Sequence, residues 1–302
     1  MGVIRTNISP RIRGGIGEYS YYTNRGDQVV RQRRNNSNYG TTARRSKSQQ
    51  ERRAKWGNLV NVYQGLLPWI GSTFTRTLEG KKGLLIVNAP SIFYSLNINS
   101  SKMYLTKEQA ALGAAVIDSY AISRGVLPSI YCSVQASMLP DQDRLMWVDV
   151  YTDDDPSQIP DIRTLSEQII GYNRGRFRNG DYFWLIKFYN YMDADNVPRV
   201  YSETLPLKLD VNNNSSTRNS PFCQAIQGQN EGRIQFTLGT DDTNCVGAAF
   251  LHTRKVNGNL QVSSQSIQMC ELDIYNEFSS SSQKNTAINS YGVDPVPSSI
   301  TL

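Results

Sequence analysis

Apolar residues recur with a helical period in the segment that follows residue 47. They stand three or four positions apart, at Trp56, Leu59, Tyr63, Leu66 and Ile70. This spacing places them on one face of an α-helix. Ser48 and Glu51 precede them with the spacing of a capping box, which satisfies free backbone N–H groups where a helix starts. The pattern predicts a helix from residue 48 that Pro68 kinks or ends.

Shorter elements alternate between residues 84 and 175. Thr106 with Gln109, and Thr164 with Glu167, have the same capping-box spacing, and each pair predicts a short helix. Apolar or alternating runs bounded by Gly, Pro, Asn or Asp predict strands. These runs span residues 84–87, 115–122, 130–134 and 145–151. The middle of the chain is therefore expected to mix helices and strands.

Alternating apolar and polar positions dominate after residue 180. The runs that predict strands span residues 182–189, 200–209, 234–238, 247–255 and 260–269. Asn257-Gly258 lies between the last two runs, and this dipeptide is the strongest short-range signal of a β-hairpin. The expected fold class is α+β, with strand-dominated antiparallel sheets, a few short helices and an extended basic N-terminal arm.

These patterns divide the chain into four expected parts. They are a basic N-terminal arm with a hairpin at 1–47, an α+β domain at 48–175, an antiparallel β domain at 176–275 and a Ser-rich C-terminal tail at 276–302. The last part has serines at all positions from 279 to 282 and prolines at 295 and 297. This composition is typical of a flexible tail or a docking peptide.

Positive charge is concentrated near the N-terminus. Of 32 Lys or Arg and 26 Asp or Glu, residues 1–56 hold 13 basic and 3 acidic ones. The rest of the chain holds 19 basic and 23 acidic residues, so a body with a net charge of −4 carries an arm with +10. A basic arm suits an acidic partner such as nucleic acid, a membrane surface or a neighbouring protein, although a solvated tail has the same composition.

The residues expected to contact a partner combine basic side chains with tyrosine. They are Arg31, Arg33, Arg34, Arg44, Arg45, Lys47, Tyr21 and Tyr22. Arginine with tyrosine suits phosphate contact and base stacking, but both residue types are also enriched at protein interfaces. The sequence therefore leaves protein and DNA open as the partner. Because residues 32–47 have few apolar side chains, we expect the arm to become ordered by contacts outside its own subunit.

Candidates for nucleophilic catalysis are few. His252 is the only histidine and lies in a predicted strand, so a structural role is favoured and a Ser or Cys triad lacks support. The four cysteines are far apart and form no Cys-x-x-Cys motif. They are interpreted as buried free thiols and not as zinc ligands.

Three acidic clusters lie in predicted turns, at residues 153–155, 193–195 and 241–242. Aspartate is favoured in turns because its side chain accepts hydrogen bonds from nearby backbone N–H groups. None of the clusters has the Gly and Glu positions of an EF-hand loop. We therefore expect no enzymatic activity, no cofactor and no metal, and a carboxylate-dependent hydrolase is the weakest alternative. No apolar run approaches the roughly 18 residues of a membrane span, so no membrane partner is expected.

Several short motifs together resemble one known group. They are Gln28-Val29-Val30-Arg31, residues 50–56 (Gln-Glu-Arg-Arg-Ala-Lys-Trp), residues 104–109, Asn179-Gly180-Asp181, and residues 252–258 with Val262-Ser263. In this order the chain resembles, over roughly residues 14 to 270, a domain family of unassigned function found in Bacteroidetes genomes and in their crAss-like phages. The resemblance implies a virion component, most plausibly a ring protein of the collar and tail below the portal. The family offers no catalytic residues to carry over.

The leading hypothesis is a structural virion protein of a tailed phage, made in the host cytoplasm and forming a ring near the portal and the DNA channel. Its expected partners are copies of itself in a homo-oligomeric ring, the portal, and neighbouring ring or tail proteins. A dodecamer is one candidate for the ring. The basic arm could also contact DNA. The alternative is a nucleic-acid-binding protein that is packaged with the genome or coats it.

Overall fold

The computed structural model describes the chain in segments. They are residues 2–4, 14–16, 19–24, 27–32, 47–67, 69–74, 89–101, 105–135, 144–152, 161–213, 220–230, 232–239, 245–270 and 280–292. Contacts divide the chain into two units, one of residues 1–46 with 292–302 and one of residues 47–291. The expected boundary near residue 175 falls inside the second unit.

The N-terminal unit contains an antiparallel sheet. Its strands are β1 (Gly2–Ile4), β2 (Gly14–Ile16), β3 (Tyr19–Asn24) and β4 (Asp27–Gln32), in the order β1-β4-β3-β2. The central pair is the hairpin that the sequence predicts, with Asn24 opposite Asp27 at its closed end. The basic arm therefore carries a sheet of its own.

The described helices of residues 47–291 are mostly short. They are α1 (Lys47–Gly65), α2 (Ile70–Phe74), α3 (Ala89–Asn97), α4 (Lys107–Ala111), α5 (Ile162–Tyr172), α6 (Pro221–Gln224) and α7 (Ser281–Ser290). Strands supply most of the remaining regular structure, in agreement with the predicted fold class.

The strands of this unit form two larger antiparallel sheets and one short pair. The five-stranded sheet has the order β13-β12-β8-β9, with β15 beside β12, and the four-stranded sheet has the order β10-β11-β7-β6. The short pair is β5 with β14. The bounds are β5 (Ala121–Ser123), β6 (Cys132–Gln135), β7 (Arg144–Tyr151), β8 (Tyr182–Met192), β9 (Pro198–Lys208), β10 (Ile226–Asn230), β11 (Arg233–Gly239), β12 (Cys245–Val256), β13 (Asn259–Val262), β14 (Gln265–Ser266) and β15 (Gln268–Met269).

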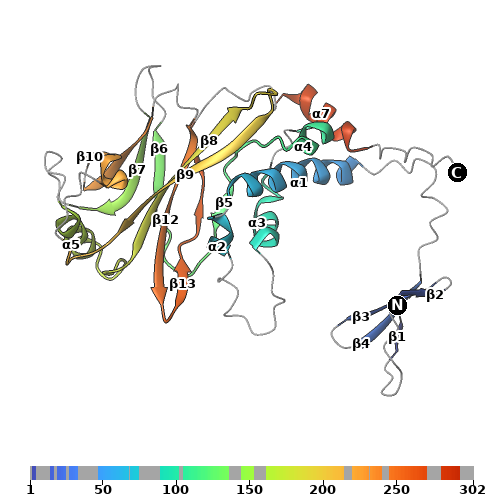
Figure 1. The fold of residues 1–302 in the computed structure, drawn as a ribbon, viewed down its shortest axis with the longest axis horizontal. Helices are drawn as coiled ribbons and strands as arrows, with labels where there is room; N and C mark the ends of the chain where they lie inside the picture. The colour runs from blue at the N-terminus through green and yellow to red at the C-terminus, as the bar shows by residue number, and fades with distance from the viewer. Residues whose placement is uncertain are drawn as a thin grey trace. The chain divides into compact units, whose positions relative to one another are not determined.

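The five-stranded sheet is the middle of three layers. Figure 1 shows β6, β7 and β10 on one side of β8, β9 and β12, and helices α1, α2 and α3 on the other. Strand β8 alternates between the two interfaces. Phe183 and Leu185 belong to the core between the sheets, whereas Ile186 and Phe188 belong to the core beneath the helices. A strand that is buried on both faces reads as a nearly continuous apolar run, which is why residues 182–189 give a strong signal.

Helix α1 differs in detail from its prediction. It begins at Lys47, so Ser48 lies within the helix and not at its cap. Leu59 and Tyr63 are buried as expected, but Trp56 is 44% exposed and packs its ring against Tyr94 at 4.6 Å between centroids. The apolar face is therefore narrower at its N-terminal end than the sequence suggests.

The other two predicted capping boxes have different outcomes. At α4 the box is confirmed: Thr106 Oγ1 accepts a hydrogen bond from the Gln109 backbone N–H, and Gln109 Oε1 accepts one from the Thr106 N–H. At α5 the prediction is wrong. The helix begins earlier, because Asp161 is the N-cap and its carboxylate accepts from the Thr164 N–H at 2.8 Å.

The strand expected at residues 115–122 is largely replaced by irregular chain that two asparagines hold. The Asn58 side chain donates to the Val116 carbonyl and accepts from its N–H, both at 2.8 Å. Asn97 makes the same pair of bonds with Ala121, at 3.0 and 2.7 Å. Each amide side chain thus takes the place of a neighbouring strand, so only residues 121–123 form β5.

The expected C-terminal tail contains a helix. In α7, Ala287 and Ile288 are buried, and the Ser290 hydroxyl accepts a hydrogen bond from the Lys107 backbone N–H at 2.9 Å. The helix packs on α1 and α4. Residues 281–290 therefore belong to the body.

The predicted strand at 84–87 lies outside the described residues.

Candidate functional site

His252 stands in the centre of β12, in the core between the two sheets and beside the start of β8. Its side chain is 0% exposed. The imidazole lies between two aromatic rings, Phe177 at 5.0 Å and Phe183 at 5.4 Å between centroids. The alternation of β12 places Arg254 on the same face as His252, one pleat further along.

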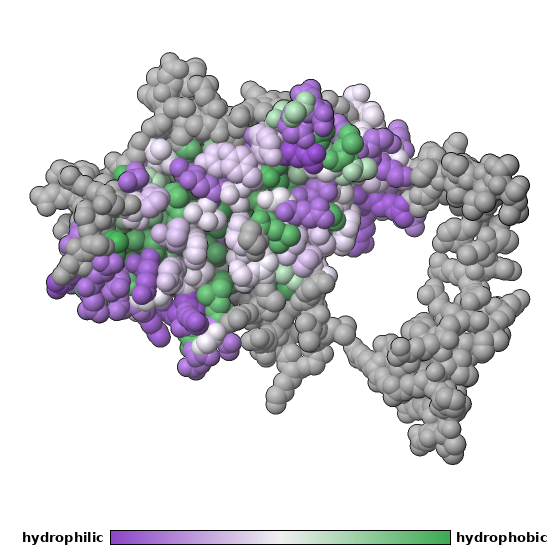
Figure 2. All heavy atoms as spheres, in the orientation of Figure 1, coloured by the Kyte–Doolittle hydropathy of each residue, from purple (hydrophilic) through white to green (hydrophobic). Residues whose placement is uncertain are grey.

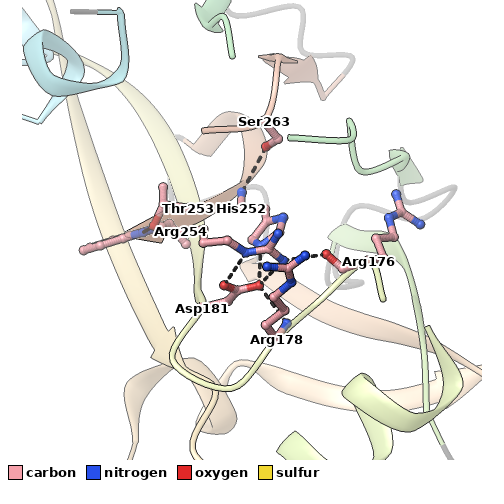
Figure 3. A network of polar contacts seen from close by, with 8 residues as sticks. Arg176, Arg178, Asp181, His252, Thr253, Arg254 and Ser263 are labelled. Carbon is pink, nitrogen blue, oxygen red and sulfur yellow. Dashed lines mark hydrogen bonds and ion pairs between the residues drawn. The ribbon is translucent and has the colours of Figure 1, made fainter. Parts of the chain in front are cut away.

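Asp181, the residue before β8, is the common partner of these two side chains (Figure 3). Its carboxylate accepts from His252 Nε2 at 2.8 Å and from Arg254 Nε and Nη2 at 2.8 and 2.7 Å. The backbone N–H of Arg178 donates to it at 2.8 Å. The carboxylate therefore accepts four hydrogen bonds, and three of them come from side chains of β12.

The hydrogen bonds outweigh the cost of burying this carboxylate. Burial raises the pKa of Asp181, but the bonds from Arg254, from His252 and from the Arg178 N–H lower it more, to about 2. Asp181 is therefore ionised at neutral pH, and the guanidinium of Arg254 balances its charge. Such bonds to an ionised acceptor are shorter and stronger than those between neutral groups.

An aspartate beside a histidine is also the pair that orients a general base in hydrolases. Here the second ring nitrogen, Nδ1, is buried and has no hydrogen-bond partner among the residues that the structure describes. The nearby Ser263 hydroxyl accepts from the His252 backbone N–H at 3.1 Å, which engages the main chain and not the ring. The arrangement is suited to holding the chain in place, since the imidazole is fully covered.

The network holds the turn of residues 173–180, named here the arginine turn. Arg254 Nη2 donates to the Arg176 carbonyl at 2.9 Å, and the Arg178 N–H donates to Asp181. The Gly180 N–H donates to the Leu209 carbonyl at 2.8 Å. Gly175 and Gly180 both have positive φ, a conformation that costs glycine little. The backbone of the turn is thus held at residues 176, 178 and 180.

The contact residues predicted in the arm are partly described. Tyr21 and Tyr22 lie in β3 and Arg31 lies in β4. Tyr22 is opposite Val29 and Ser20 is opposite Arg31, so positions 22 and 31 share one face of the sheet and position 21 lies on the other. Lys47 is the first residue of α1 and is exposed. Arg33, Arg34, Arg44 and Arg45 lie outside the described residues.

One predicted acidic cluster is described, and it is a turn as expected. The Asp193 carboxylate accepts from the backbone N–H groups of Asp195 at 3.0 Å and Val197 at 2.8 Å, and from Arg199 Nε at 2.8 Å. These bonds, led by that from Val197, lower the pKa of Asp193. The clusters at 153–155 and 241–242 lie outside the described residues.

Metal-ligating residues do not gather in the part of the chain that the structure describes. There, no group of three or more His, Cys, Asp or Glu side chains could hold a metal ion. The four cysteines are free and buried. Among the described helices, none is long and apolar enough to cross a bilayer.

The Asp181 network was missed in the sequence because its members lie 71 residues apart. One signal pointed to it: His252 and Arg254 alternate on a predicted strand, so both must find a partner on the same face. Comparison of the chain with protein-family models, with curated proteins and with solved structures found no match. The resemblance to the phage-associated family therefore stays a prediction.

Proposed function

We propose that this chain is a non-enzymatic structural subunit, specifically a ring-forming virion protein of the collar or tail of a tailed phage, near the portal and the DNA channel. The observation that carries the proposal is the division of the chain. A unit with a core of its own, residues 47–291, continues from a basic N-terminal unit that has a separate sheet. Strands outside the body can pair with the edge of a neighbour's sheet, which is one established mode of recognition between chains.

Edge strand β9 and its neighbour β8 supply a surface suited to subunit contact. Tyr201 stacks on Tyr189 with ring centroids 4.6 Å apart and planes at 6°, and Tyr191 meets Tyr201 edge-on at 5.7 Å. Tyr201 is 45% exposed. Stacked tyrosines offer a large, rigid contact area at low entropic cost, and tyrosine is enriched where proteins bind one another. We name Tyr189, Tyr191 and Tyr201 the tyrosine ledge.

The buried Asp181 network supports a structural role over a catalytic one. Its histidine is fully covered and its carboxylate is saturated with hydrogen bonds. In a closed ring, the same surfaces recur at every interface, so a separate arm and a ledge would meet a neighbour at each position. The assignment to a virion rests on the resemblance stated above, in addition to the N-terminal unit and the tyrosine ledge.

Mass photometry of the full chain, alone and with portal protein, tests the proposal. We expect one discrete oligomer or a complex with the portal. Tyr201→Thr should reduce its abundance, whereas Tyr182→Thr, which changes another exposed tyrosine of the same strand pair, should not. A strict monomer that also fails to join the portal would contradict the proposal.

Deleting residues 1–46 tests the role of the N-terminal unit separately. We expect circular dichroism and the melting curve to show a folded body, because the core of residues 47–291 is its own, and we expect assembly to be lost. A truncated chain that assembles like the full one would show that the unit is dispensable.

The second candidate, a nucleic-acid-binding protein, is favoured by the arginine turn on the body. DNA binding without any oligomer would favour this alternative over a ring subunit.

A further inference from the structure

Three arginines alternate within the arginine turn. Arg174, Arg176 and Arg178 lie between Asn173 and Gly180, and the turn contains no acidic residue. Arg174 and Arg178 are exposed. Neither has an ion-pair partner among the residues that the structure describes. Their charges are therefore available to a partner.

Other basic residues come from neighbouring segments. Arg176 Nη2 donates to the Ser129 carbonyl at 2.6 Å, which brings the loop that carries exposed Arg124 beside the turn. Strand β12 adds Arg254, which bonds to the turn, whereas Lys255 alternates to the opposite face of the strand. The arginine turn thus lies against two other segments of the chain, each bonded to it through an arginine.

Two acidic residues next to the turn are already engaged. Asp181 is buried and bound by Arg254 and His252. Asp210, next to the Leu209 carbonyl that holds the turn, lies 3.9 Å from Lys208 Nζ. The local charge is consequently positive, although residues 57–302 as a whole carry −4. Figure 2 shows hydrophilic side chains at the tip of the β12–β13 hairpin, the strand pair that contributes Arg254.

The Asp181 network makes the turn rigid. Burying an ion pair costs free energy that apolar side chains of the same volume would not, so such a pair is a weak source of stability. Here its bonds go to the backbone at Arg176 and Arg178, which carry the arginines. A backbone that is already fixed loses less conformational entropy when the turn binds a partner.

We propose that the arginine turn is a binding site for the phosphate backbone of double-stranded DNA. Guanidinium groups match phosphate oxygens with paired hydrogen bonds, and arginine is the residue preferred for this task. Exposed tyrosines adjoin the arginines, with Tyr172 directly before the turn and Tyr131 just after Ser129. The inference goes beyond the proposed function, because it assigns DNA contact to the body and would hold for a chain that never forms a ring.

Fluorescence anisotropy with a labelled duplex, using the full chain over a series of salt concentrations, tests the site. The variant Arg174→Gln with Arg178→Gln should lose roughly tenfold in affinity, and the slope of log affinity against log salt should fall by about two. The matched control is Arg163→Gln with Lys284→Gln, which removes the same charge from α5 and α7. We expect its affinity to change by less than about twofold, since neither residue belongs to the surface.

Protection from phenylglyoxal, read by mass spectrometry, locates the contact directly. We expect DNA to protect Arg174 and Arg178 in the full chain. Protection confined to arginines of the N-terminal unit would overturn the site. So would the absence of DNA binding at low salt, or equal affinity for polyglutamate or anionic vesicles. Mass photometry of the same sample reports ring assembly independently, so failure of this site is distinguishable from failure of the proposed function.

Discussion

Nε2 of His252 lies 2.8 Å from Oδ2 of Asp181, although 71 residues separate them along the chain. The contact ties the turn after α5 to the middle of β12, and Arg254 reinforces it from the next pleat of the same strand. Removing the carboxylate would leave Arg254, whose side chain is mostly buried, without its counterion.

Asp181→Asn should therefore destabilise the body strongly. We expect the free energy of unfolding to fall by about 3 to 5 kcal/mol, the usual cost of removing one partner of a buried ion pair. Urea unfolding followed by circular dichroism measures it. Asp195→Asn, at an exposed turn position, is the control and should change stability by no more than about 0.5 kcal/mol. Equal effects of the two substitutions would mean that the network contributes little.

The Asp181 carboxylate should also make the free energy of unfolding depend on pH in the acidic range. Its pKa in the folded chain is about 2, below the ordinary value of 3.8, so the ionised form stabilises the fold above pH 4. This contribution, about 2 kcal/mol, should be lost as the pH falls from about 4 to about 2. Between pH 4 and pH 2, the free energy of unfolding should therefore change less with pH for Asp181→Asn than for the natural chain. Parallel curves would show that other carboxylates govern acid unfolding.

Asn58→Ala should also cost stability. The Asn58 side chain donates to the Val116 carbonyl and to the Tyr120 hydroxyl, and it accepts from the Val116 N–H, all at 2.8 Å in a buried site. Its loss leaves backbone groups without partners, so we expect a fall of about 3 kcal/mol in the free energy of unfolding. Asn212→Ala, at an exposed position, should leave the urea midpoint nearly unchanged. A small effect at Asn58 would mean that water replaces the amide.

Two glycines should respond to alanine with opposite signs. Gly258 has a φ of +79° in the β12–β13 turn, so Gly258→Ala should destabilise by about 1 to 2 kcal/mol. Gly171 lies in α5, and a Cβ there would meet nothing within 4 Å. Gly171→Ala should stabilise by about 0.5 to 1 kcal/mol, because alanine favours the helix. Differential scanning calorimetry of both variants checks the pair, and shifts of the same sign would contradict it.

Elements whose bonds are local could be predicted from the sequence. The β12–β13 hairpin follows from Asn257 and Gly258, both of which have positive φ as a tight hairpin requires. Strand β8 follows from its apolar run, and the start of α4 follows from Thr106 and Gln109.

Elements that depend on distant partners could not. Residues 115–120 read as a strand, but their hydrogen bonds go to asparagine side chains that periodicity does not reveal. Helix α7 has a weak apolar pattern and gains its buried face only by packing on α1 and α4. The arginine turn could not be predicted for a different reason: three arginines in a body with a net charge of −4 form a positive surface only because the fold buries the adjacent Asp181 in an ion pair with Arg254.

The sharing of β8 between two cores bears on how the body unfolds. If the core between the sheets unfolded alone, one face of β8 would become exposed to solvent while Ile186 and Phe188 stayed packed on the other. If the core beneath the helices unfolded alone, Phe183 and Leu185 would be left in the same position. Neither core can unfold without destabilising the other, so residues 47–291 should unfold in one all-or-none transition. Fluorescence from the tryptophans and circular dichroism from the sheets should then trace a single superimposable curve.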